Sequence, residues 1–178
     1  MNYQITLDGN DVAMATEVGT RRNQSNIYWG SENKKVSKRS DVDIHISGFA
    51  GEVAFARITE HIAPYSCEID LEDTHNVEDT WIGDVTVDVK TFGWEKTNLL
   101  VPAHKNNKDK ACEIYVLMTG GLPTFTMRGW IPGKELFATE PVRYPTKILN
   151  HKIPQARLRD PRELLKSTPA QVRLLLEE

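Results

Sequence analysis

Hydrophobic residues recur at helical spacing in two stretches near the start of the chain, and this pattern predicts helices over residues 11–24 and 48–60. Asp11 would cap the first helix, because its carboxylate can accept a hydrogen bond from a backbone N–H of the first turn. Between the two helices, residues 25–47 are mostly polar, and they end in the alternating segment 41–47, which predicts a short strand or an extended lead-in. The residues that define the two apolar stripes are Val12, Ala15 and Val18 in the first helix and Phe49, Val53 and Ala56 in the second.

Residues 79–90 alternate between hydrophobic and polar side chains on either side of a glycine, which predicts a β-hairpin. Three further runs rich in β-branched and aromatic residues, 97–101, 113–119 and 124–131, predict strands. Two glycines and a proline between the last two runs predict a second hairpin. The second strand of the first hairpin would bury Val85, Val87 and Val89 on one face and carry Thr86, Asp88 and Lys90 on the other.

A two-residue turn at Gly83 and Asp84 fixes which residues of the first hairpin face one another. In this register Asp79 and Asp88 lie directly opposite each other, and Trp81 falls on the same face. Like charges so placed destabilise a sheet by roughly 0.2–1 kcal/mol unless a proton or a cation lies between them. The other predicted pairs are Ile82 with Val85, Trp81 with Thr86 and Thr80 with Val87.

The hairpin offers oxygen ligands of the kind that Mg²⁺ or Mn²⁺ binds. The carboxylates of Asp79 and Asp88 and the backbone carbonyl of Val89 would hold such an ion, which lowers the pKa of bound water and neutralises charge on a substrate phosphate. Glu52, expected in the first turn of the second helix, could bind the metal through water, complete a second metal site or orient the nucleophile. Lys90 would place a fixed positive charge beside the attacking water and the phosphate. One reaction, the metal-assisted hydrolysis of a phosphodiester, accounts for all of these residues.

The order of these elements resembles the PD-(D/E)XK nuclease superfamily, whose fold is called restriction-endonuclease-like: a helix with Glu52, a strand with Asp79, a tight turn, and a strand with Asp88-Val-Lys90. The phrases Ile-Tyr-Val-Leu-Met-Thr-Gly, Arg-Gly-Trp-Ile-Pro-Gly and Ile-Pro-Gln-Ala-Arg-Leu also resemble small phage and prophage proteins of that superfamily. The resemblance extends over roughly residues 10–165. It implies an α/β (α+β) fold with a central mixed β-sheet flanked by helices, in which a helix, three antiparallel-leaning strands, a second helix and a further strand follow one another.

The activity that the resemblance implies is a Mg²⁺-dependent or Mn²⁺-dependent deoxyribonuclease, acting on DNA in the cytoplasm of a bacterial or phage-infected cell. Many relatives cut two strands as dimers, so a homodimer is one assembly to expect. The chain departs from the family pattern at Glu78, which occupies the position of the proline before the first aspartate. Asp84 or Asp73 could replace Asp79 as the first ligand. Two other functions stay open: a catalytically lapsed nuclease fold that binds DNA or serves in assembly, and a hairpin whose carboxylates have only a structural role.

Composition sets wide limits on these interpretations. A chain of 178 residues fits one domain, 1–178, in which 159–178 form a C-terminal helical extension. In that extension Asp160 and Thr168 each precede a proline and cap a short helix. The sequence contains no apolar run of about 18 residues and no charged-then-apolar leader, so we expect a soluble protein without a membrane span.

Net charge and cysteine content say little about the function of this protein. The net charge of −3 gives no global signature of nucleic-acid binding, although several basic clusters could contact phosphates. Cys67 and Cys112 are interpreted as reduced thiols. The basic clusters contain Arg21 and Arg22; Lys34, Lys35, Lys38 and Arg39; Lys105, Lys108 and Lys110; and Arg157, Arg159 and Arg162.

Among the aromatic residues, Trp94 follows the hairpin in a polar loop and is the best candidate to stack on a base of DNA, whereas Trp130 lies within a strand and is expected in the core.

Overall fold

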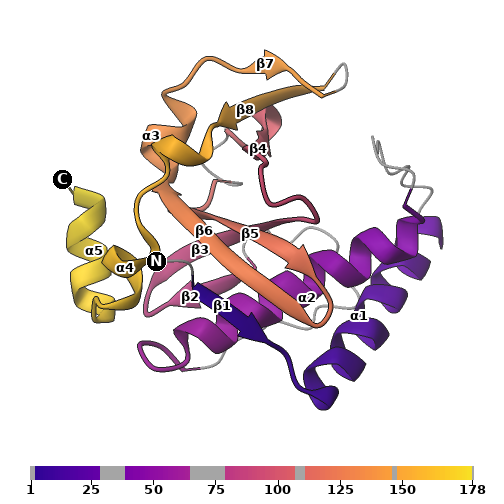
Figure 1. Ribbon diagram of the computed structural model, residues 1–178. Coiled ribbons are helices and arrows are strands. Elements are labelled where there is room, and N and C mark those ends of the chain that lie inside the picture. Colours follow the sequence, from indigo (N-terminus) through magenta and orange to yellow (C-terminus); the bar gives the residue numbers. More distant parts are fainter. Residues whose placement is uncertain (1–2, 29–38, 65–78, 107–110, 146–147, 178) are drawn as a thin grey trace.

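A mixed five-stranded β-sheet lies at the centre of the computed structural model, which describes residues 3–28, 39–64, 79–106, 111–145 and 148–177 (Figure 1). Its strands follow the spatial order β1-β6-β5-β3-β2, in which β3 and β5 run parallel and the other neighbours are antiparallel. The strands are β1 (Tyr3–Thr6), β2 (Thr80–Ile82), β3 (Val85–Phe92), β5 (Ile114–Gly121) and β6 (Thr124–Pro132). The predicted class, a mixed sheet with flanking helices, is confirmed.

Two long helices lie on one side of this sheet. Helix α2 (Asp41–Thr59) packs against β3 and β5, and helix α1 (Gly9–Tyr28) packs along α2 (Figure 1). Val85, Val87 and Val89 of β3 belong to the hydrophobic cluster between the sheet and the helices. The valine face predicted for the hairpin is therefore confirmed.

Both helices begin earlier than the sequence pattern indicates. Asp8, not Asp11, caps α1: its carboxylate accepts hydrogen bonds of 2.8 and 2.9 Å from two backbone N–H groups of the first turn. Helix α2 is capped by Ser40, whose hydroxyl accepts a hydrogen bond of 3.2 Å from the N–H of Asp43. Residues 41–47 are therefore helical, and the strand or extended lead-in predicted there is wrong. The cap supplies the start signal, and it outweighs the alternation of side-chain type in this short segment.

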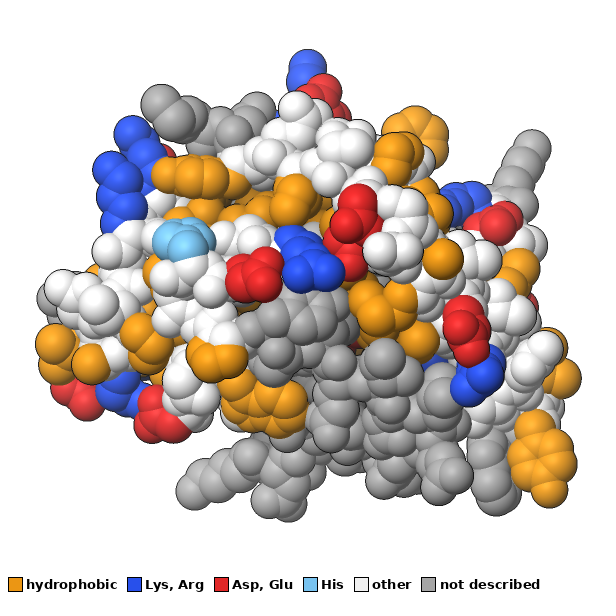
Figure 2. Space-filling view, turned by 90° about the horizontal axis from the view of Figure 1, so that it is seen from below, with side chains coloured by type: hydrophobic (Ala, Val, Ile, Leu, Met, Phe, Trp, Pro, Cys, Tyr) orange, Lys and Arg blue, Asp and Glu red, His pale blue; other side chains and the backbone are white. Residues whose placement is uncertain are grey.

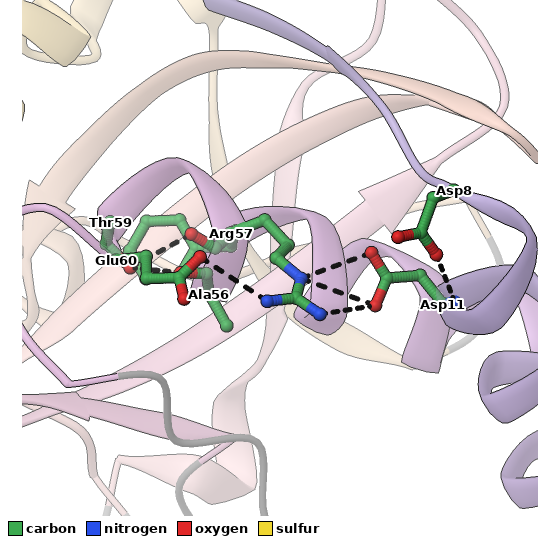
Figure 3. A network of polar contacts seen from close by, with 7 residues as sticks. Asp8, Asp11, Ala56, Arg57, Thr59 and Glu60 are labelled. Carbon is green, nitrogen blue, oxygen red and sulfur yellow. Dashed lines mark hydrogen bonds and ion pairs between the residues drawn. The ribbon is translucent and has the colours of Figure 1, made fainter.

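Asp11 joins the two helices instead. It is a buried acidic residue of α1, and its carboxylate accepts hydrogen bonds from Nε and Nη2 of Arg57 on α2, the shortest of them 2.9 Å long (Figure 3). Arg57 also forms an ion pair of 3.4 Å with Glu60. A forked arginine–carboxylate contact constrains direction as well as distance, so this pair fixes how α1 lies on α2.

Two glycines permit unusually close approaches between elements. A Cβ atom at Gly19 would lie 2.4 Å from the Cα of Ile46, so α1 and α2 touch backbone to backbone at this point. A Cβ atom at Gly51 would lie 1.9 Å from Oγ1 of Thr91, which brings the middle of α2 onto β3. Since a larger residue would collide at either position, the glycines determine how closely the helices approach each other and the sheet.

A second, smaller sheet with the strand order β4-β8-β7 covers the other face of the main sheet (Figure 1). An apolar cluster that includes Leu99, Tyr115 and Leu117 fills the space between them. Within the described residues 93–106 and 111–113, the connection from β3 to β5 contains β4 and a short 3₁₀ turn, so the helix that the family resemblance implies at this point is not found there. The elements of this region are β4 (Leu99–Pro102), η1 (Ala103–Lys105), α3 (Gly133–Phe137), β7 (Val142–Arg143), β8 (Leu149–Ile153) and η2 (Gln155–Arg157).

The remaining elements follow the predictions closely. Strands β5 and β6 form the predicted second hairpin. Helices α4 (Pro161–Leu165) and α5 (Pro169–Glu177) begin at the predicted caps. The carboxylate of Asp160 accepts from the N–H of Arg162 at 2.8 Å, and the N–H of Thr168 donates to the Gln171 side chain at 2.8 Å. The apolar residues of these helices that join the same core as α2 are Leu164, Leu165 and Val172.

Acidic and basic side chains lie next to one another on the helical side of the molecule, with hydrophobic side chains between them (Figure 2). On α1, Arg21 pairs with Glu17 at 2.7 Å. Arg159 and Arg162 of the C-terminal basic cluster also pair with acidic neighbours. Several residues that could contact phosphates are thus already engaged within the chain. In the described part of the protein, every helix is too short or too polar to cross a lipid bilayer.

Candidate active site

The first hairpin forms with the predicted register over three residue pairs. Asp79, the next residue outward, lies outside this ladder, and its backbone N–H donates to the carbonyl of Val87 at 2.9 Å. The ladder therefore does not contain the cross-strand pair predicted between Asp79 and Asp88. The pairs that do form are Thr80 with Val87, Trp81 with Thr86 and Ile82 with Val85.

The side chain of Asp79 bonds to the backbone of β3 instead. Its Oδ2 atom accepts a hydrogen bond of 2.6 Å from the N–H of Val89. Strand β2 pairs with residues 85–87, so Asp79 takes the first position beyond this ladder on the same edge of β3. The N–H and C=O of one strand residue point toward the same neighbour. The Val89 carbonyl therefore faces this edge as well.

Asp88 is fully buried and lies between two lysines. The ammonium of Lys90 forms an ion pair with Oδ1, and Nζ of Lys105 lies 2.5 Å from Oδ2. Burial alone would raise the pKa of Asp88, but the two lysines outweigh it and hold the pKa below its ordinary value. Asp88 is therefore ionised at neutral pH.

Asp79 differs from Asp88 in its protonation. Burial, followed by the nearby carboxylates of Glu52 and Asp88, raises the pKa of Asp79 to about 8. The charge of Lys90 and the hydrogen bond from Val89 act in the opposite direction and offset only part of this rise. Two carboxyl groups on one strand edge thus have pKa values shifted in opposite directions, as in many catalytic sites.

Glu52 reaches this site from the middle of α2, not from its first turn as predicted. It is buried, and both of its carboxylate oxygens lie 3.0 Å from Nη1 of Arg22 on α1. The guanidinium of Arg22 also lies over the ring of Phe49, 4.7 Å from its centroid. Burial raises the pKa of Glu52, with Arg22 and Lys90 acting against the rise. The helix and its arginine thus hold a third carboxylate close to Asp79.

The structure brings the predicted residues Glu52, Asp79, Asp88 and Lys90 together: the charges of the other three act on the pKa of Asp79 and on that of Lys90. Asp84, the alternative first ligand, does not belong to this group: it lies in the hairpin turn, its side chain is 78 % exposed, and it pairs with Arg173. The other alternative, Asp73, lies outside the described residues. Below, the name edge site stands for Glu52, Asp79, Asp88 and Lys90 together with their partners Arg22 and Lys105.

Arg22 and Lys105 are the members of the edge site that the sequence pattern did not single out. Each appeared only as part of a basic cluster, because nothing in the local sequence links Arg22 to Glu52 or Lys105 to Asp88. The distance along the chain is 30 residues for the first pair and 17 for the second. Cys112 lies nearby but stays protonated, since burial, followed by the charge of Asp88, raises its pKa to about 12.

The edge site offers donors that suit a hard divalent cation. Among the described residues, no three or more His, Cys, Asp or Glu side chains are grouped so that they could hold a metal ion. Mg²⁺ commonly binds through only one or two carboxylates and completes its shell with water and substrate oxygens. The carboxylates of Asp79 and Asp88 and the Val89 carbonyl are donors of that kind. Burial and then the charges of Glu52 and Asp88 raise the pKa of Asp79, and a cation would offset the second of these causes.

Comparison with known proteins found no relative of this chain. No protein-family model, no curated protein and no solved structure matches the chain.

The two tryptophans singled out in the sequence, Trp94 and Trp130, differ sharply in their exposure. Trp94, in the loop that follows β3, is 78 % exposed. Its neighbour Glu95 is held on two sides, by Nη2 of Arg128 at 2.8 Å and by Nε2 of Gln155, which donates to the Glu95 carbonyl at 2.7 Å. Trp130 is fully buried, as predicted. The loop therefore presents one indole to solvent from an anchored backbone.

Proposed function

We propose that this protein is a divalent-metal-dependent deoxyribonuclease that hydrolyses phosphodiester bonds in DNA at the edge site. The observation that carries the proposal is the grouping of three carboxylates around Lys90: Asp88 is ion-paired with Lys90, Asp79 is bonded to the N–H of Val89 on the same strand, and the charges of Glu52 and Asp88 both act on Asp79. Grouping three carboxylates in a buried place costs stability, and such clusters are typical of functional sites. The order of helix, strand, turn and strand around them supports a restriction-endonuclease-like core.

Mg²⁺ or Mn²⁺ would be held by the carboxylates of Asp79 and Asp88 and by the Val89 carbonyl, with Glu52 acting through water or at a second metal. When bound, the metal supplies an acidified water and neutralises charge on the phosphate. The chain's own groups prepare this arrangement. The N–H of Val89 holds the Asp79 carboxylate at the strand edge, and Arg22 orients the Glu52 carboxylate through both of its oxygens.

Lys90 supplies the positive charge for the phosphate. Burial works against its charged form, but Asp88 and Asp79 outweigh burial and raise the pKa of Lys90 above its ordinary value. Its side chain is 24 % exposed, so part of it lies at the surface of the site. A fixed charge that stabilises the transition state contributes about 10²–10³-fold to the rate in well-studied enzymes.

The test is cleavage of plasmid, linear and branched DNA with Mg²⁺, with Mn²⁺ or with EDTA. Wild type is compared with Asp88→Ala and Lys90→Ala, and with the matched controls Asp84→Ala and Lys96→Ala, which change an exposed aspartate and an exposed lysine outside the edge site. We expect metal-dependent cutting that both site variants lose and both controls keep. Cutting that survives both site variants would refute the assignment of the site.

A second candidate function is a nuclease fold that no longer cleaves and binds DNA or serves in assembly. One observation favours it: Lys90 and Lys105 pair with both oxygens of Asp88, and Arg22 pairs with Glu52, so the protein neutralises these carboxylates by itself. A folded wild type that binds DNA but cuts none of the three substrates would support this candidate. A purely structural role for the hairpin would place Asp88 in solvent, whereas Asp88 is buried.

A further inference from the structure

Two lysines neutralise Asp88, and they reach it by different routes. Lys90 stands two residues further along the same strand, so its side chain emerges on the same face as Asp88 wherever β3 forms. Lys105 comes from η1, at the end of β4, and its Nζ lies 2.5 Å from Asp88 Oδ2. The second contact therefore depends on tertiary structure alone.

Lys105 is also the less constrained of the two partners. It is the last residue of a 3₁₀ turn of three residues. Pro102, which precedes this turn, forms no side-chain hydrogen bond that would cap it. Single 3₁₀ turns have poorer hydrogen-bond geometry than α-helices, and a lysine carries its charge on a flexible four-carbon stem. The side chain is 23 % exposed, so part of it already lies at the surface.

We propose that Lys105 is an exchangeable counter-ion: it neutralises Asp88 when no divalent cation is bound, and it moves to a substrate phosphate when the cation takes Asp88 Oδ2. This inference rests on the proposed function. An ammonium and a divalent cation repel each other strongly at adjacent positions on one carboxylate. The backbone at η1 keeps the displaced ammonium within reach of the edge site, where the phosphate of a bound substrate offers it a new partner of opposite charge.

The exchange couples two binding events. A cation that displaces Lys105 frees a positive charge for DNA, and DNA that attracts Lys105 frees Asp88 for the cation. Because linkage is reciprocal, each ligand must raise the affinity for the other by the same factor. Lys105 would thus make metal binding strong only in the presence of a phosphate backbone.

The test measures Mn²⁺ binding by electron paramagnetic resonance, with and without a short phosphorothioate DNA oligonucleotide whose linkages resist hydrolysis. Wild type is compared with Lys105→Met, with Lys105→Arg and with the control Lys96→Met, which changes an exposed lysine. Without oligonucleotide, we expect Lys105→Met to bind Mn²⁺ about tenfold more tightly than wild type. Substrate oxygens can also bind the metal directly, so the oligonucleotide should strengthen Mn²⁺ binding in every protein, but by a clearly larger factor in wild type, Lys105→Arg and Lys96→Met than in Lys105→Met.

An unchanged or weaker Mn²⁺ affinity of folded Lys105→Met would overturn the inference and leave Lys105 as a structural partner of Asp88. If Lys105→Met does not fold, Lys105→Gln is measured with the same expectations, since its amide can still donate to Asp88. The readout separates the two proposals. A wild type that binds Mn²⁺ in this pattern but cuts no DNA refutes only the nuclease, whereas a wild type and variant that both bind no Mn²⁺ refute both.

Discussion

The carboxylate of Asp79 accepts a hydrogen bond of 2.6 Å from the backbone N–H of Val89. This bond holds an acidic group on β3 just beyond the ladder with β2, where the charges of Asp88 and Glu52 act on it. The position is electrostatically unfavourable, because burial and these two carboxylates raise the pKa of Asp79 to about 8.

The raised pKa of Asp79 makes stability depend on pH. In the unfolded chain Asp79 loses its proton near its ordinary pKa of 3.8, whereas in the folded protein it keeps the proton until about 8. The folded state therefore binds more protons between these values, and the contribution of Asp79 to the free energy of unfolding falls as pH rises through this window. We expect Asp79→Asn, which keeps the hydrogen bond without the charge, to gain stability relative to wild type by about 1–2 kcal/mol at pH 8.5.

Urea unfolding of both proteins at several pH values from 5 to 9 checks this expectation. The difference between them should grow with pH, while Asp84→Asn, a change in the exposed turn, should follow wild type throughout. A constant difference between Asp79→Asn and wild type would contradict the raised pKa.

The pairing of Arg22 with Glu52 predicts an asymmetric response to mutation. Arg22→Ala leaves a buried carboxylate without its guanidinium, and breaking a buried pair from one side typically costs about 3–5 kcal/mol. Glu52→Gln removes the charge but keeps an acceptor for Arg22, so it should cost less stability. Both variants should lower metal-dependent cleavage, and thermal unfolding together with the nuclease assay measures the two effects separately. Equal loss of stability in both variants would show that the charge on Glu52 does not matter for folding.

The close contact between α2 and β3 predicts that two neighbouring glycines respond in opposite ways. Gly51→Ala would place a Cβ atom 1.9 Å from Oγ1 of Thr91 and should destabilise the protein by about 1–3 kcal/mol. Gly48→Ala meets nothing within 4 Å and should stabilise the same helix by up to about 1 kcal/mol. Chemical denaturation of the two variants makes the comparison, and similar values for both would refute the contact.

The exposed indole of Trp94 predicts a contribution to DNA binding. Stacking of a base on an aromatic side chain is worth about 1–3 kcal/mol, so Trp94→Ala should weaken the binding of a single-stranded oligonucleotide by about tenfold or more. Trp94→Phe should recover most of the affinity, because it keeps an aromatic face. Fluorescence anisotropy without added metal measures binding apart from cleavage, with Leu174→Ala as a control at another exposed hydrophobic residue. Equal affinities for wild type and Trp94→Ala would exclude stacking on this residue.

The sequence by itself determined the parts of the protein that local rules control. The hairpin register followed from the turn at Gly83, which has a positive φ of 68°, and from side chains that alternate with period two. The caps at Asp160 and Thr168 followed from the residues that satisfy the first N–H groups of a helix. Asp88 and Lys90 had to share one face of β3, because they are two residues apart on the same strand.

Two features lie close in sequence and were still predicted wrongly: segment 41–47 is helical because Ser40 caps it, and Asp79 bonds to a backbone N–H where the pairing pattern predicted a cross-strand partner. Only the tertiary structure decided the contacts that join residues far apart along the chain. Arg22 and Lys105 found their carboxylates through the packing of α1 on α2 and of η1 beside β3. Spacing and alternation describe one element at a time, whereas charge pairing in a buried site depends on which elements fold together.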